Sequence, residues 1–318
     1  MGRAVDAGLF APVAEDLDYI ELRIRASIAD DDGPPMSGPM GALFAAGGKR
    51  LRPALVLLAG RLGRFQAAHH NAAMAVELVH AATLVHDDVI DKSPLRRGLP
   101  TVAAALGDEP AIVVGDYYFA KAYEQAALTE EPAVVAVIAS AVMWICRGEL
   151  AQHEARYRYR TSVEEYLARI QGKTATLLAA SAWIGGRLAG LDKPAQAALH
   201  AFGTELGLAF QIADDVLDYT ADAAELGKPV GQDLLEGHAT LPLLLADLPE
   251  PLPDGRPLTA EQVAVAVQSV RASGGPERAL AEAGRHAAAA RAHLAGLPAG
   301  PVRDSLSNLA GYVVERRR

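Results

Sequence analysis

The chain has few aromatic residues and almost no cysteine. Aromatic residues make up 5% of its 318 residues, and Cys146 is its single cysteine. One cysteine excludes an internal disulfide and is typical of proteins in a reducing compartment, so we expect a cytoplasmic protein. Cys146 lies in an apolar helical pattern, which favours a packed thiol over a nucleophile.

An excess of basic charge and long hydrophobic runs are also missing. The 30 Lys and Arg residues against 39 Asp and Glu leave a net charge of −9, which argues against nucleic-acid binding. The longest uncharged stretches, Pro132–Cys146 and Thr174–Gly186, fall short of the ~20 residues that a membrane span needs. The N-terminus has no apolar core typical of a signal peptide. We expect no transmembrane segment, although a hydrophobic product could bring the protein to a membrane surface.

Sustained period-2 patterns bounded by hairpin signals are absent, whereas helical periodicity is widespread. Apolar residues recur at helical spacing in several long segments: Asn71–Asp91, Glu109–Leu128, Pro132–Arg156 and Val163–Leu188. Glycine and proline gather at the predicted breaks: Asp31–Pro39, Pro94–Pro100, Glu225–Gly231, Pro249–Pro257 and Leu297–Pro301. These patterns predict an all-α protein with one domain spanning 1–318. The Pro249–Pro257 segment is either a linker or, as we prefer, a long loop before C-terminal helices.

Two acidic runs of the form DDxxD stand inside apolar sequence. They consist of Asp87, Asp88 and Asp91, and of Asp214, Asp215 and Asp218. On a helix, positions i and i+4 share one face, so each run stacks two carboxylates with a third close by. Such carboxylates repel one another and are costly to desolvate, which favours a bound cation over a merely solvated acidic face. Oxygen ligands indicate Mg²⁺, which commonly binds carboxylates together with substrate phosphates.

Cationic and hydrogen-bonding residues near helix ends supply suitable partners for anionic substrates. His80 lies two helical turns before Asp87, and Lys173 and Thr174 are expected to begin an apolar helix whose N–H groups favour an anion. Each residue alone could be an ordinary surface charge or a core histidine. Together they suit a ligand set with two diphosphates: Lys49, Arg52, His80, Arg96, Arg97, Lys173, Thr174 and Lys228.

In this order, these motifs resemble the trans-isoprenyl diphosphate synthases, the polyprenyl synthetase family. The resemblance covers roughly residues 40–245 and includes GGKRLRP, ELVHAATLVHDDVID, RRGLPT, GKTA, FQIADDVLDY and GKPVGQDLLEG. It implies an all-α isoprenoid-synthase bundle around a deep central cavity, usually a homodimer. The implied activity is the head-to-tail condensation of isopentenyl diphosphate with an allylic prenyl diphosphate, with Mg²⁺ as the cofactor, three ions per active site when substrate is bound.

The resemblance also implies a role for each matching residue. Isopentenyl diphosphate would bind Lys49, Arg52, His80 and Arg97, and the allylic diphosphate would bind Arg96, Lys173, Thr174, Gln211 and Lys228. Asp87, Asp91 and Asp214 would be the leading metal ligands, supported by Asp88, Asp215 and Asp218. The metal ions, with Lys173, Lys228 and Arg96, would neutralise charge on the departing diphosphate. That diphosphate is the usual base in the family, so no side chain is assigned to proton removal.

Two positions depart from the family pattern. His238 stands where the family usually has lysine, and a neutral imidazole there would weaken the grip on the allylic diphosphate unless the anion protonates it. Ala103 stands where the family commonly has histidine or asparagine, which removes one polar contact. Neither departure touches the acidic runs.

Product length is predicted from the residues upstream of Asp87. Ala82 and Thr83 lie ~6–8 Å along the helix from the metal site, and an aromatic residue there would stop elongation early. Ala82 and Val79 leave the path open, which favours a medium- or long-chain product. Met143 or Trp144 could form its floor, although Trp144 could equally be a core residue.

Several competing interpretations remain at this point. A terpene cyclase would normally lack GGKRLRP and the second DDxxD run. A phosphohydrolase using His86 and Asp87 would not explain Asp214–Asp218. A geranylgeranyl or farnesyl diphosphate synthase differs in product length alone. A non-catalytic subunit of a two-component synthase typically loses acidic-run residues, and both runs are complete here.

Overall fold

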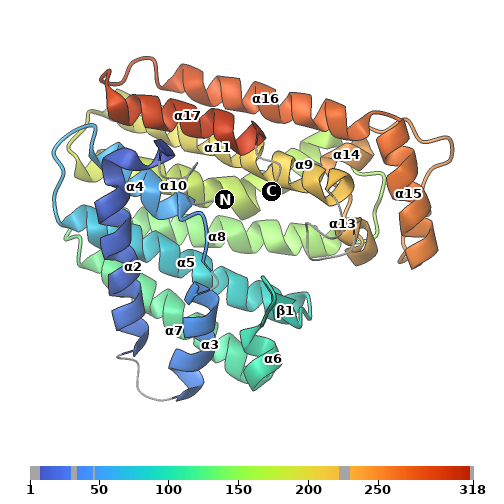
Figure 1. Cartoon of the computed structure of the whole chain (residues 1–318), viewed down its shortest axis with the longest axis horizontal. Coiled ribbons are helices and arrows are strands. Elements are labelled where there is room, and N and C mark those ends of the chain that lie inside the picture. The colour runs from blue at the N-terminus through green and yellow to red at the C-terminus, as the bar shows by residue number, and fades with distance from the viewer. Residues whose placement is uncertain (1–7, 30–33, 46, 222–229, 316–318) are drawn as a thin grey trace. The chain divides into compact units, whose positions relative to one another are not determined.

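The computed structural model describes residues 8–29, 34–45, 47–221 and 230–315, and within these ranges its regular secondary structure is helical except for one small hairpin (Figure 1). The predicted all-α class is therefore confirmed. The chain divides into two compact units. Unit 1 comprises Met1–Ser140, Ala180–Leu199 and Leu297–Ser305, and unit 2 comprises Ala141–Ala179, His200–Gly296 and Leu306–Arg318. That these units form a single domain stays a prediction.

Within each unit the elements occur in the following chain order. Unit 1 holds η1 (Ala11–Val13), α2 (Ala14–Ala29), α3 (Pro34–Ala45), α4 (Leu51–Gly60), α5 (Ala68–Ile90), β1 (Leu95–Arg96), β2 (Leu99–Pro100), α6 (Val102–Leu106) and α7 (Asp108–Ala127). Unit 2 holds α9 (Val163–Ile170), the π-helical turn η2 (Gln171–Ala175), α13 (Gln232–Glu236), α14 (Leu241–Leu244), α15 (Ala260–Ala272) and α16 (Gly275–His293). Both units contain residues of α8 (Pro132–Glu154), α10 (Thr176–Leu188), α11 (Lys193–Thr220) and α17 (Pro301–Glu315).

Helix α5 forms the core of unit 1 because most of its side chains are buried. It packs most extensively against α7 and also against α4. At the α5–α7 contact, His86 lies against Gly115, where an added Cβ would come within 2.2 Å of the imidazole Nε2. Because Gly115 has no side chain, α5 and α7 can approach each other here. This contact fixes the end of α5 that carries the first acidic run.

Two apolar clusters stabilise unit 2. One surrounds Tyr159, Tyr219 and Leu234, and the other surrounds Tyr166 and Ile212. Helix α9 begins with a capping box, in which Ser162 accepts a hydrogen bond from the N–H of Glu165 and the Glu165 side chain accepts one from the N–H of Ser162. This cap satisfies otherwise unpaired donors at the start of the helix that carries Tyr166.

The structure corrects two expectations about the chain and bears out a third. Helix α3 begins at Pro34, inside a predicted break, because proline lacks an N–H that the first turn would leave unpaired in any case. Cys146 is exposed rather than packed. The Pro249–Pro257 segment is a packed loop and no linker, since Asp254 accepts a hydrogen bond from the Tyr159 N–H (2.7 Å) within unit 2.

Helix α8 is the one described helix long and apolar enough to cross a membrane by length and composition, with a mean hydropathy of 1.7. A single helix of this kind is weak evidence for a membrane span. Only 22% of its most apolar window is buried, and Met143, Trp144 and Leu150 are exposed. The face of α8 that carries these three residues is thus an uncovered apolar surface of the single chain.

Candidate active site

The three carboxylates of the first acidic run differ in exposure. Asp87 is half-buried, Asp91 is exposed at the C-terminal end of α5, and Asp88 is only 3% exposed. The side chain of Asp88 accepts hydrogen bonds from Arg96 Nε at 3.0 and 3.1 Å, and Arg96 Nη2 lies 2.8 Å from its Oδ1. Asp87 and Asp91 are therefore the two carboxylates of this run that solvent can reach, one helical turn apart.

Arg96, predicted to bind the allylic diphosphate, is paired with Asp88 within the protein. This arginine lies in β1, and the β1–β2 hairpin after α5 returns it onto the helix. Because both oxygens of Asp88 are engaged by Arg96, the pair is a charge-assisted contact with little freedom to rearrange. Asp88 thus holds the Arg96 side chain in place, and the role of Arg96 in binding an anion stays a prediction.

A group of arginines surrounds His80 in unit 1. Burial lowers the pKa of His80 well below its usual value, and the neighbouring charges of Arg52, Arg97 and Arg96 lower it further. The imidazole is therefore neutral at pH 7, since protonation would add a positive charge beside positive charges. Burial also lowers the pKa of Arg52 to about 10, although the charge of Glu77 opposes this shift.

This cationic group has the features of a built anion site. The Nε atom of Arg52 is buried without a hydrogen-bond partner among the described residues, which is costly unless a ligand engages it. Arg97 lies over Gly48, and an added Cβ there would meet its guanidinium at 3.3 Å. Because Gly48 has no side chain, it leaves room for Arg97. Lys49, half-buried in the loop before α4, completes the predicted set.

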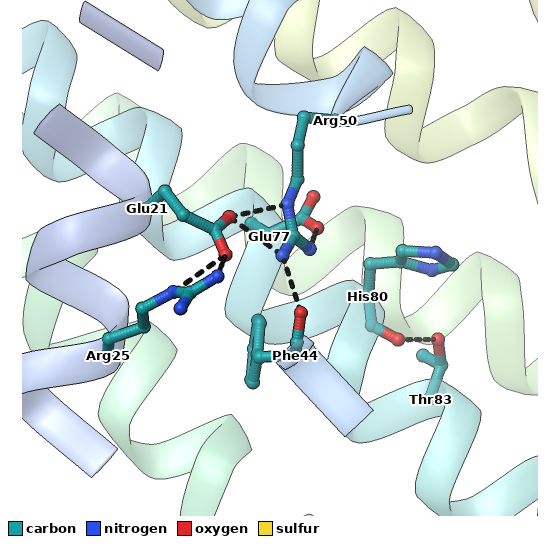
Figure 2. A network of polar contacts seen from close by, with 7 residues as sticks. All are labelled: Glu21, Arg25, Phe44, Arg50, Glu77, His80 and Thr83. Carbon is teal, nitrogen blue, oxygen red and sulfur yellow. Dashed lines mark hydrogen bonds and ion pairs between the residues drawn. The ribbon is translucent and has the colours of Figure 1, made fainter. Parts of the chain in front are cut away.

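Sequence reasoning missed Arg50, which lies between Lys49 and Arg52 but does not join the cluster as a ligand-binding group. Arg50 has φ 46°, a left-handed conformation at the N-cap of α4. Its guanidinium donates to Glu77 (2.6 Å), to Glu21 (2.9 Å) and to the carbonyl of Phe44 (Figure 2). Arg50 therefore connects α2, α3 and α5 to the loop that carries Lys49. The charged Glu77 inside an apolar helical segment was the sequence signal for such a buried basic partner.

The second acidic run, in unit 2, exposes one carboxylate. Asp214 is exposed, whereas Asp215 and Asp218 are 5% and 3% exposed. Asp218 accepts hydrogen bonds from the backbone N–H groups of Gln232 (3.2 Å) and Asp233 (3.0 Å), so it caps the first turn of α13. Although the two runs read alike in sequence, the last aspartate of the second run is a structural cap.

Asp215 is enclosed by hydrogen-bond donors. The Tyr166 hydroxyl donates to its Oδ2 (2.6 Å) and the Gln211 amide donates to its Oδ1 (2.7 Å). Burial nevertheless raises the pKa of Asp215 to about 7, because desolvation of the carboxylate outweighs the effect of these donors. The nearby negative charge of Asp214 raises this pKa as well.

Lys173 and Thr174 do not begin a helix, which corrects the sequence prediction. They lie in the π-helical turn η2, which runs without interruption from α9 into α10, so free helix-terminal N–H groups are not the source of anion binding here. Lys173 Nζ lies 2.6 Å from Glu149 Oε2, and Thr174 donates to Gln211 (2.8 Å). An added Cβ at Gly148 would meet the Lys173 N at 2.7 Å, so this glycine lets α8 contact the turn.

The remaining predicted positions lie as follows. His238 is neutral at pH 7, because burial, and then the charges of Lys173 and Arg169, lower its pKa to about 4. Ala103 is half-buried in α6. Lys228 lies outside the described residues. Sequence analysis left open whether His238 is neutral or protonated, and the neutral form binds a diphosphate more weakly.

The residues predicted to set product length differ in their exposure to solvent. Val79 and Ala82 are fully buried in α5, and Thr83 is half-buried with its hydroxyl donating to the His80 carbonyl (2.8 Å; Figure 2). Met143 and Trp144 are 57% and 51% exposed, so Trp144 is not a core residue of the single chain. Their part in setting product length stays a prediction.

The carboxylates suit a metal bound jointly with substrate. Among the described residues, no group of three or more His, Cys, Asp or Glu side chains is arranged to hold a metal by itself. Accessible oxygen ligands on Asp87, Asp91 and Asp214 fit Mg²⁺, which commonly completes its coordination with water and phosphate oxygens. The phosphohydrolase interpretation fits poorly, because His86 turns toward α7 and bonds the Ile112 carbonyl (3.1 Å).

Comparison with known proteins assigns the chain to a family. It matches the polyprenyl synthetase family model over residues 34–250, more than half of its length, and therefore belongs to that family of prenyltransferases. It is 37% identical over 314 residues to heptaprenyl diphosphate synthase component 2 of Geobacillus stearothermophilus, covering 97% of this chain and 98% of that protein. It is also 37% identical to octaprenyl diphosphate synthase of Escherichia coli over 290 residues, 87% of this chain and 88% of that protein.

Solved structures agree with this assignment. A polyprenyl synthase from Caulobacter crescentus CB15, complexed with calcium and isoprenyl diphosphate, has a TM-score of 0.91 at 36% identity and covers 98% of both chains. A decaprenyl diphosphate synthase from Rhodobacter capsulatus has a TM-score of 0.89 at 34% identity, covering 98% of this chain and 99% of that one. The predicted family and fold are confirmed.

Proposed function

We propose that this prenyltransferase condenses isopentenyl diphosphate head to tail with an allylic prenyl diphosphate and releases a medium- or long-chain polyprenyl diphosphate. The similarity to heptaprenyl, octaprenyl and decaprenyl diphosphate synthases supports this product class. Ala82 on α5 is a small residue at the position where an aromatic side chain would stop elongation early, which favours a longer product. A geranylgeranyl or farnesyl product is the alternative that product analysis would reveal.

The arginine cluster around His80 carries the proposal. Arg52 has a buried Nε without a described partner, Arg97 lies over Gly48, and the His80 imidazole, whose pKa these arginines lower, is neutral. These groups suit the diphosphate of isopentenyl diphosphate, since its charge would offset the mutual repulsion of the arginines. His80 lies on α5 two turns from Asp87, so one helix carries both this anion site and the first metal-binding run.

The allylic diphosphate is proposed to bind Lys173, Thr174 and Gln211, with Lys228 and Arg96 as further cations. Mg²⁺, proposed as three ions with substrate bound, would neutralise charge that develops on the departing diphosphate. Asp87, Asp91 and Asp214 would hold these ions. Asp88, Asp215 and Asp218 would act indirectly, because their oxygens accept hydrogen bonds within the protein.

The chain would promote the reaction by position and charge. After the allylic carbon–oxygen bond breaks, the double bond of isopentenyl diphosphate attacks the resulting cation and a proton leaves. Lys173, held by Glu149, would stabilise the leaving diphosphate, and the apolar side chains of α5 would exclude water that could quench the cation. No side chain is assigned as base.

A homodimer working in the cytoplasm is part of the proposal. The exposed apolar face of α8, with Met143, Trp144 and Leu150, is of the kind that subunit contacts cover. A second candidate is a two-component enzyme, because the Geobacillus relative is named as one component of a synthase. Analytical ultracentrifugation of the purified chain distinguishes a homodimer from a monomer that requires a second, different subunit.

Kinetics of Arg97→Ala test the proposed isopentenyl diphosphate site. Loss of one charge-assisted contact is worth roughly ten- to a hundredfold in binding, so we expect the KM for isopentenyl diphosphate to rise by that factor. The KM for the allylic substrate should stay within about twofold, because its proposed ligands lie elsewhere. The control is Arg61→Ala, which removes an exposed arginine paired with Asp16. Equal effects of both substitutions would contradict the assignment.

A further inference from the structure

Along α11, residues spaced four apart form a single stripe. Gly203, Gly207, Gln211 and Asp215 follow one another at i, i+4, and such positions share one helix face. An added Cβ at Gly203 would come within 2.6 Å of the Ala179 Cα, and one at Gly207 within 2.4 Å of the Ala175 Cα. The two glycines therefore bring α11 into backbone contact with the end of η2 and the start of α10.

This close contact brings polar groups from α9, η2 and α11 into a continuous chain. Thr174 Oγ1 donates to Gln211 Oε1 (2.8 Å), Gln211 Nε2 donates to Asp215 Oδ1 (2.7 Å), and the Tyr166 hydroxyl donates to Asp215 Oδ2 (2.6 Å). Tyr166 has no exposed surface and Asp215 is 5% exposed. The buried end of this chain therefore lies at Tyr166, and its half-buried member is Gln211.

The direction of each hydrogen bond follows from the acceptor at the buried end. The Gln211 amide turns its NH₂ group toward Asp215 Oδ1 and the Tyr166 hydroxyl donates to Oδ2, so both oxygens of Asp215 act as acceptors. The amide oxygen of Gln211 then faces Thr174 and accepts a hydrogen bond from its single hydroxyl proton. Among the described residues, this arrangement leaves the second N–H of Gln211 and the oxygen lone pairs of Thr174 for a ligand.

We propose that Tyr166 is a positioning residue for the prenyl transfer: its hydroxyl fixes Asp215, and through Asp215 it sets the orientation of the Gln211 amide toward the allylic diphosphate. The inference depends on the proposed function, because it assigns Gln211 to that substrate. Without the hydroxyl, Asp215 loses one donor and can rotate, and the amide of Gln211 is free to flip. A flipped amide would turn an oxygen toward the anion in place of an N–H.

The test compares Tyr166→Phe with a matched control, Tyr159→Phe. Tyr159 is also a buried tyrosine of unit 2, and its hydroxyl contacts the Arg256 carbonyl instead of a carboxylate. We expect Tyr166→Phe to raise the KM for the allylic substrate about tenfold, since hydrogen bonds to charged groups are worth roughly ten- to a hundredfold. The KM for isopentenyl diphosphate should change less than about twofold, and Tyr159→Phe should change neither by more than about twofold.

A binding measurement that does not depend on catalytic turnover accompanies the kinetics. Calorimetric titration with inorganic pyrophosphate in excess Mg²⁺ should show weaker binding to Tyr166→Phe by a similar factor, with Tyr159→Phe like the unsubstituted protein. A double-mutant cycle of Tyr166→Phe with Thr174→Val measures the coupling, and we expect the two losses to be non-additive, because both act on the same amide.

The outcomes separate the inference from the proposed function. Equal kinetics of the two phenylalanine variants, additive losses in the cycle, or parallel rises in both KM values would overturn the positioning role of Tyr166. If Tyr166→Phe does not fold, Asp215→Asn with unchanged pyrophosphate binding would overturn it as well, because the proposed effect of Tyr166 acts through Asp215. Absence of product from the unsubstituted protein would instead contradict the proposed function, and pyrophosphate binding would still test the positioning role.

Discussion

Replacing Ala82 by phenylalanine is expected to shorten the product. Ala82 lies five residues before Asp87 on α5, or about 7.5 Å along the helix at ~1.5 Å per residue. Its side chain has no exposed surface. If the growing chain passes Ala82, a benzyl group there blocks its path close to the metal-binding aspartate, and the product stops at a short length.

The same substitution reports on packing, which makes the outcome interpretable. If Ala82 borders a path for the product, phenylalanine fills space and costs little stability. If Ala82 packs into a filled core, insertion of the larger ring costs about 1–3 kcal/mol. Such a loss would lower the melting temperature by roughly 2–4 °C per kcal/mol, as for domains of 150–250 residues. Thermal unfolding and product chromatography on the same variant therefore distinguish the two cases.

Ala75→Phe provides a matched control on the same helix. Ala75 is also fully buried and lies two turns further from Asp87, about 18 Å along the helix. We expect Ala75→Phe to shorten the product less than Ala82→Phe, because the chain grows further before it meets the ring. A destabilised Ala82→Phe enzyme that releases product of unchanged length would refute the view that this face of α5 lines the path.

Three further substitutions have expected outcomes. Glu77→Ala leaves Arg50 without its closest partner and should cost about 3–5 kcal/mol, far more than Glu21→Ala, whose carboxylate is more exposed; urea unfolding giving equal losses would contradict this. Asp215→Asn should flatten the stability–pH profile of the substrate-free protein. Because folding raises this pKa from 3.8 to about 7, the contribution of Asp215 is full below pH ~4 and is lost as pH rises through ~7, by at most about 4 kcal/mol. Melting temperatures from pH 5 to 8 with unchanged slope would count against it. His238→Lys should lower the KM for the allylic substrate while destabilising the substrate-free protein, because it adds a cation where His238 is neutral; an unchanged KM would exclude His238 from that site.

Local patterns predicted the helices well, because apolar spacing reflects which face of each helix is buried. The predicted segment Asn71–Asp91 corresponds to α5 at Ala68–Ile90, and Glu109–Leu128 corresponds to α7 at Asp108–Ala127. The segment Val163–Leu188, predicted from its periodicity to be helical, contains the π-helical turn Gln171–Ala175. One added residue in a turn hardly disturbs apolar periodicity, so the pattern could not reveal it.

The different roles of equivalent aspartates could not be predicted from the acidic runs. Asp88 is held by Arg96 from a hairpin, Asp215 by Tyr166 from a preceding helix, and Asp218 caps the helix that follows. Each role depends on an element that packs against the run in three dimensions. Helical spacing places three carboxylates close together, but only the packed fold decides which of them face solvent.

The most direct test of the account is product analysis with the purified, unmodified chain. The assay combines isopentenyl diphosphate, Mg²⁺ and either farnesyl or geranylgeranyl diphosphate, and mass spectrometry measures the length of the products. We predict elongation of the allylic primer to a polyprenyl diphosphate longer than geranylgeranyl diphosphate, with loss of product when a chelator removes the metal. No elongated product from the chain alone would contradict the central claim and favour a chain that acts only with another subunit.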